Sequence, residues 1–150
     1  MTMSVSWEYI AECLRGELAD YGGLLHLFEA QQRALFDRDA HVVLQLANEI
    51  ENHANALAQS RTVREQAVAD FALENDQPAN SSLRALLPFI ESDARPLIEA
   101  LINEVNALLH RVRRTSRHNH SLLTRTVEIH QETLSLLRPN SFTKTYSPGG

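Results

Sequence analysis

The chain has 150 residues, of which 43% are hydrophobic and 22% are charged, and its net charge is −5. These values are typical of one globular domain, and an acidic chain argues against general nucleic-acid binding. A single cysteine, Cys13, excludes an internal disulfide and a thiolate metal cluster. The sequence shows no signal peptide and no run of about 18 apolar residues, so we expect a soluble cytoplasmic protein without membrane insertion.

Glycine and proline are scarce, with five of each, which favours long helices over short strands joined by turns. From Val5 to about Phe36, apolar residues recur in steps of three and four, as in an amphipathic helix. Ser4 or Ser6 is suited to cap its start. The pair Gly22-Gly23 inside this pattern indicates either close packing or a mild bend.

A second helix is predicted to begin after Asp39, a good N-cap, and to run to about Glu74. The short connection between the first two helices requires them to be antiparallel. Residues 74–82 have the composition of a loop, and residues 83–90 suit one or two helical turns. We expect Ser92-Asp93 to cap the next helix.

The third helix is predicted from Ala94, with Pro96 tolerated in its first turn, and Pro139 closes it. Its length of roughly 66 Å exceeds the roughly 50 Å of each of the other two. If the three helices pack side by side, about ten residues project beyond the first turn, with Ile129, Leu134, Leu136 and Leu137 exposed. Such leucines indicate a protein-binding surface; the alternatives are that the hairpin bends or that a second subunit covers them.

The predicted fold is therefore all-α: an elongated antiparallel bundle of three long helices, with a short extra helix and a flexible C-terminal tail. We expect residues 1–139 to form one helical domain and residues 140–150 to form the tail, because two aromatic residues cannot offset the ordering cost of eleven residues.

Charge is divided unevenly along the chain. Residues 1–80 hold 13 acidic residues and five arginines, a balance of −8, whereas residues 81–150 hold six acidic residues, eight arginines and one lysine, a balance of +3. Either the two halves attract each other in the folded bundle, or the second half presents a basic surface to a partner. The arginines at 111, 113, 114 and 117 surround the helix and have no aromatic neighbours for base stacking, so we expect no nucleic-acid partner.

The seven histidines do not form a recognisable metal motif. His118 and His120 are two residues apart and point to different faces of a helix, and Glu49 with His53 resembles a surface pair. The sequence also lacks a glycine-rich phosphate loop and a nucleophile motif. We therefore expect no metal, no cofactor and no enzymatic activity.

The C-terminal part carries a family resemblance. Asn119-x-x-Leu122-Leu123, followed by "QETLSLLRP" and the tail "TYSPGG", resembles the C-terminal signature of the FlgN-type flagellar export chaperones. The stretch "FEAQQRALFDRDAHVVLQLANEIE", residues 28–51, is similar to that family across the first turn.

This resemblance implies a small cytoplasmic chaperone that binds the C-terminal helical regions of hook-associated (hook–filament junction) proteins. It keeps them unassembled and delivers them to the cytoplasmic domain of the flagellar export gate. By motif match, Tyr146 is expected to dock at the gate. The expected client-binding residues are Asn119, Leu122, Leu123, Leu134 and Leu137. The alternative is a structural adaptor without a secretion role, whose projecting helix forms a homodimer.

Overall fold

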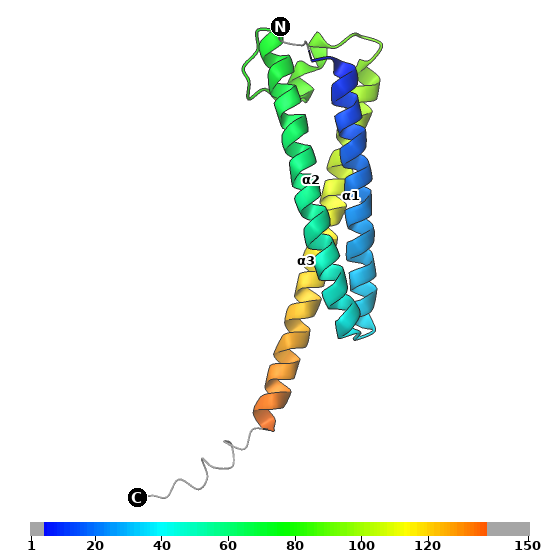
Figure 1. Ribbon diagram of the computed structural model, residues 1–150, viewed down its shortest axis with the longest axis vertical. Helices are drawn as coiled ribbons and strands as arrows, with labels where there is room; N and C mark the ends of the chain where they lie inside the picture. The colour runs from blue at the N-terminus through cyan, green and yellow to red at the C-terminus, as the bar shows by residue number, and fades with distance from the viewer. Residues whose placement is uncertain (1–4, 138–150) are drawn as a thin grey trace, which may run out of the picture.

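Three long helices and one short helix make up residues 5–137, the part of the chain that the computed structural model describes (Figure 1). In chain order they are α1 (Trp7–Phe36), α2 (Ala40–Glu74), the short 3-10 helix η1 (Arg84–Phe89) and α3 (Arg95–Leu136). The predicted elongated all-α bundle of three long helices with a short extra helix is confirmed. The predicted tail lies outside the described residues.

A three-residue turn joins α1 to α2 and makes them antiparallel. At the end of α1 the N–H of Asp39 donates to the carbonyl of Ala34 (2.9 Å) and that of Arg38 to Leu35 (3.2 Å). These bonds satisfy carbonyls left free at the helix end, with Arg38 in the left-handed region at φ 56°. Asp39 then caps α2, because its side chain accepts from the Val42 N–H at 3.3 Å. The expected Asp39 cap is confirmed.

Helix α1 is the central element of the bundle. It packs along both α2 and α3, whereas the backbones of α2 and α3 approach each other closely at few positions. Since α2 runs back along α1, α3 runs parallel to α1 (Figure 1). The core forms along α1 from residues that share one face, including Ile10, Leu14 and Tyr21. Ser6 caps this helix by accepting from the Tyr9 N–H at 3.3 Å, as expected for one of the two candidate serines.

Close packing, one of the two alternatives for the glycine pair in α1, is found at Gly23 and not at Gly22. Helix α1 is continuous through both glycines. A Cβ at Gly23 would lie 2.9 Å from Cε1 of His53 on α2, whereas one at Gly22 would meet nothing within 4 Å. The His53 ring, 2.9 Å from the Asp20 carbonyl through Nε2, therefore sits directly against Gly23. The sequence suggested a surface contact between His53 and Glu49, whereas the His53 ring packs against α1.

A buried ion pair also joins α1 to α2. Glu17 is fully buried, and its two carboxylate oxygens accept from Nε (2.8 Å) and Nη2 (3.2 Å) of Arg64. The Arg64 side chain is 22% exposed. A buried carboxylate is tolerated when its oxygens are hydrogen-bonded and its charge is matched, as both are here.

The predicted Ser92-Asp93 cap of the third helix is wrong. The residue before α3 is Ala94, and no side chain caps the helix there. The Glu91 carbonyl instead accepts from the N–H groups of Ala94 (2.9 Å) and Arg95 (3.2 Å). Pro96, in the first turn of α3, has no N–H, so fewer donors remain for a capping side chain.

Candidate protein-binding surface

Helix α3 continues past the end of α1. Asn119 on α3 lies beside Phe28 on α1, since its Nδ2 donates to the Phe28 carbonyl at 2.7 Å. Helix α1 has eight more residues before it ends at Phe36, so the parallel α3 passes that end near residue 127. We call residues 127–137 the overhang; Figure 1 shows it extending beyond the α1–α2 turn. The predicted projection of about ten residues is confirmed.

The overhang exposes the apolar side chains that the sequence placed there. Leu134 is 63% exposed and Leu137 is 70% exposed, and Ile129 and Leu136 are also exposed. The hairpin therefore does not bend over them in this structure. Coverage by a second subunit is the alternative that stays open.

The exposed side chains continue the stripe by which α3 joins the bundle. Counting in alternating steps of three and four from Val112, the same face passes through Asn119, Leu122, Ile129 and Leu136. Val112 and Asn119 are buried, Leu122 is half-buried, and Ile129 and Leu136 are exposed. The exposure rises where α1 ends, so the overhang is bundle surface that lacks its partner helix.

A groove lies where this exposed stripe meets the α1–α2 turn. Its volume is about 440 Å³, and all three long helices contribute to it. We call it the turn groove; its apolar lining consists of Ala34 and Leu35 from α1, Ala40, Val43 and Leu44 from α2, and Leu123 and Ile129 from α3. Arg38, Thr126 and His130 complete the lining. A smaller hollow of about 190 Å³ beside it shares Leu35, Val43 and Leu123.

Asn119 lines the smaller hollow but points inward. Its side chain is only 3% exposed, and Nδ2 donates to the Phe28 carbonyl and, at 3.2 Å, to Oε1 of Gln31. Its Oδ1 is buried and has no hydrogen-bond partner in the structure. Asn119 therefore holds α3 against α1 at the edge of the groove, and its free acceptor is the polar feature of that edge.

The structure thus separates the expected client-binding residues into three environments. Leu123 lines the turn groove, Leu134 and Leu137 lie on the overhang, and Leu122 and Asn119 lie between α3 and the bundle. Tyr146 lies outside the described residues. Leu44 on α2 also lines the turn groove, and the sequence did not predict this. The apolar pattern of α2 does not reveal that α3 passes close to Leu44.

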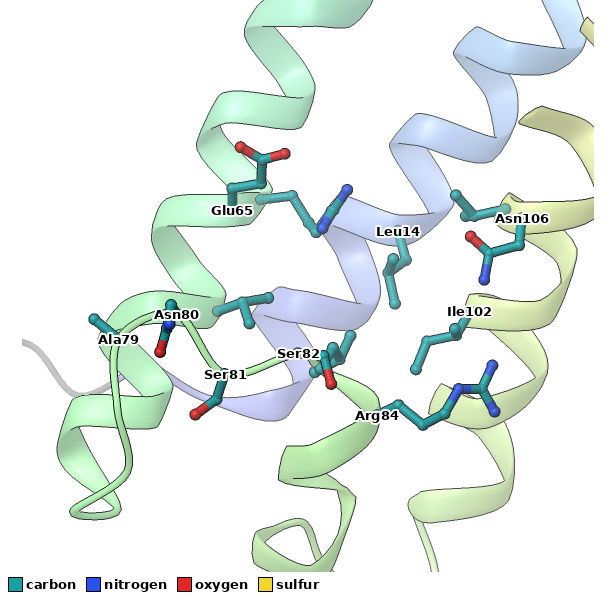
Figure 2. Close-up of a pocket in the computed structure, with 13 residues that line it drawn as sticks. Leu14, Glu65, Ala79, Asn80, Ser81, Ser82, Arg84, Ile102 and Asn106 are labelled. Carbon is teal, nitrogen blue, oxygen red and sulfur yellow. The ribbon is translucent and has the colours of Figure 1, made fainter. Parts of the chain in front are cut away.

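A second cavity, of about 420 Å³, lies at the opposite end of the bundle. Figure 2 shows Leu14, Ile102 and Asn106 facing it from α1 and α3, with residues 79–82 closing another side. Its two guanidinium groups are already engaged: Arg64 binds Glu17, and Arg84 donates to Oδ1 of Asn103 at 2.8 Å. The arrangement gives no free charge with which to select a ligand.

Several charged and titratable side chains elsewhere have structural partners. His118 lies 2.6 Å from Nε2 of Gln32 through Nδ1, and Arg111 pairs with Glu29 at 3.9 Å, which joins the basic and acidic halves. Cys13 raises the pKa of the Tyr9 phenol through its charge and a hydrogen bond. Across residues 5–137 no three His, Cys, Asp or Glu side chains are grouped as metal ligands. In the same range no helix is both long and apolar enough to span a membrane.

The fold and this surface define an all-helical protein with an unpartnered apolar helix end beside a groove. The model of the family described as "FlgN protein" matches residues 1–150, the whole chain. The chain belongs to the FlgN family, which is a family of flagellar export chaperones. Neither the curated proteins nor the solved structures with which it was compared gave a match.

Proposed function

We propose that this protein is a cytoplasmic chaperone for hook-associated (hook–filament junction) proteins. It binds their C-terminal helical regions, keeps them unassembled and delivers them to the cytoplasmic domain of the export gate. The observation that carries this proposal is the overhang: a helix end with exposed apolar side chains, among them Leu134 and Leu137, that has passed the end of its partner helix α1.

The client segment is an amphipathic helix that takes the place α1 would have if it were longer. Its apolar side lies against Leu134 and Leu137, and its end enters the turn groove at Leu123. Anchors spaced three and four residues apart are the usual contacts of a helix in an apolar groove. Covering the client's assembly helix in this way requires no nucleotide, because apolar burial supplies the free energy.

Leu122 and Asn119 form the inner edge of the client site. Leu122 is half-buried and continues the stripe, while Asn119 supports this edge from behind by bonding α3 to the Phe28 carbonyl of α1. A single polar contact within an apolar interface fixes the register of paired helices.

Delivery depends on Tyr146, the residue that matches the family's tail tyrosine. One aromatic residue on a short terminal segment gives a small interface, which suits a contact that must form and release. The gate's cytoplasmic domain is the proposed partner of this residue.

The client site is tested by changing Leu134 and Leu137 together to serine. Because both side chains are exposed, the free energy of unfolding should change by less than about 0.5 kcal/mol per site. Binding of the C-terminal region of a hook-associated protein, measured by calorimetric titration, should weaken by at least about tenfold. The matched control changes Val63 and Leu73, which are 51% and 59% exposed on α2 away from the overhang, to serine.

The control variant should bind the client as the unchanged chain does. Equal loss in both variants, or unfolding of the overhang variant, would remove the overhang from client binding. If the unchanged chain binds no client and its mass doubles with concentration, the overhang serves a second copy, as in the alternative of a dimerising adaptor.

A further inference from the structure

Of the segments outside the described residues, residues 138–150 are the ones that start near the turn groove. Two segments fall outside the described residues, 1–4 and 138–150. The start of α1 is at the other end of the bundle (Figure 1), 28 residues or roughly 42 Å along the helix from Leu35. Four residues span at most about 14 Å, so the N-terminal segment cannot contact the groove.

The C-terminal segment starts close enough to return. The path back from Leu137 to Ile129 is eight helical residues, about 12 Å, and that to Leu123 is about 21 Å. Phe142 follows Leu137 by five residues and Tyr146 by nine, which allows spans of up to about 17 Å and about 30 Å. Both aromatic side chains can therefore reach the turn groove without any change in α3.

The chemistry of the segment also matches the groove. A volume of about 440 Å³ with a largely aliphatic lining suits one or two aromatic rings. Residues 138–150 contain Arg138 and Lys144 and no acidic side chain. The groove lining itself carries one formal charge, that of Arg38, and Asp37 and Asp39 flank this residue in the α1–α2 turn.

We propose that the aromatic side chains of Phe142 and Tyr146 of the same chain occupy the turn groove when no client is bound, with Phe142 as the principal anchor. Holding these two side chains does not require all of residues 140–150 to be ordered. If the groove is also the client site, as the proposed function holds, client and tail compete for it. A client would then both displace the tail and release Tyr146 for the gate. Only this regulatory consequence rests on the proposed function; the intramolecular contact does not.

The size of the effect follows from the short connection. A short flexible link gives an effective concentration on the order of 1 mM. If the aromatic contact alone has a dissociation constant of about 0.1 mM, the form with the tail in the groove is about ten times as populated as the open form. Client affinity should then rise about tenfold when the tail is removed.

Methyl NMR on the protein alone tests the contact. The full chain is compared with one that stops after Pro139, and with the full-length double variant Phe142→Ser, Tyr146→Ser. Methyl signals of Leu35, Val43 and Leu123 should shift in both, while those of Val68 and Ile102 at the other end of the bundle stay in place. Adding a synthetic peptide of residues 140–150 at about 1 mM to the shortened chain should restore the original positions.

Groove signals that are identical in all three proteins would overturn the proposal. So would shifts that depend on protein concentration together with a doubled mass, because the occupant would then belong to a second copy. The outcome is independent of the client experiment. If the groove signals do not change but the Leu134, Leu137 variant loses client binding, the tail contact is wrong and the proposed function stands. If the groove signals shift but the protein binds no client, the tail contact stands and the proposed function is wrong.

Discussion

The two ends of α3 have similar sequence patterns and opposite surroundings. In residues 95–119 the apolar stripe faces α1, and Ile98, Leu101 and Val112 are buried. In residues 127–137 the stripe continues with Ile129 and Leu136, both exposed. The difference arises because α1 ends at Phe36 while α3 does not. An amphipathic pattern therefore indicates that one face of a helix packs against another helix. The length of the neighbouring helix decides whether that packing partner comes from the same chain.

If the bundle is stable without the overhang, contacts within the bundle should dominate the free energy of unfolding. The largest expected effect is that of the buried ion pair. Arg64→Met leaves the fully buried Glu17 carboxylate without its partner and should lower the free energy of unfolding by about 3–5 kcal/mol. Urea unfolding followed by circular dichroism measures it. The double change Glu17→Leu, Arg64→Met should recover most of that loss, because no charge is then buried alone. A double variant as unstable as the single one would contradict this account.

A matched pair on α3 tests the comparison directly. Ile98→Ala removes a fully buried side chain and should cost about 2–5 kcal/mol of unfolding free energy, whereas Leu134→Ala should change it by less than about 0.5 kcal/mol. Both values come from the same urea titration. Similar costs at the two positions would mean that the overhang is covered in solution, and a mass measurement would then show whether a second copy covers it.

The two adjacent glycines of α1 give a smaller and opposite pair of effects within the bundle. Gly23→Ala places a Cβ 2.9 Å from the His53 ring and should destabilise the protein by about 1–3 kcal/mol. Gly22→Ala meets no atom within 4 Å and should stabilise it by up to about 1 kcal/mol, since alanine favours the helix. Thermal unfolding of the two variants side by side measures this difference. Equal melting temperatures would show that the His53 ring moves freely.

The smallest expected effect on folding is that of Tyr146→Ala. A terminal aromatic residue far along the chain from the core should leave the melting temperature almost unchanged. Affinity for the cytoplasmic domain of the export gate, titrated with client present, should fall by about 1–3 kcal/mol. Phe142→Ala is the matched control for this titration, since the displaced tail uses only the tyrosine at the gate. Equal affinities of the Tyr146 variant and the unchanged chain would remove Tyr146 from delivery.

The sequence alone determined the helices and most of their ends. Periodicity in steps of three and four placed all three long helices within two residues of their observed bounds. The caps at Ser6 and Asp39 were also predictable, because each bonds to an N–H three residues away. The overhang followed from helix lengths alone. Ser92-Asp93 failed because a local turn and a proline had already reduced the need for a cap.

Only the tertiary structure decided which side of each helix became a core and which became a binding surface. Glu17 resembles any charged helix residue until Arg64 meets it from α2, and Asn119 resembles a surface amide until α1 supplies the Phe28 carbonyl. The turn groove requires Leu44 on α2 and Leu123 on α3, which are far apart in the sequence. Periodicity describes one helix at a time. Burial of a side chain depends on whether another helix lies beside it at that position along the bundle, which is a property of the assembled bundle.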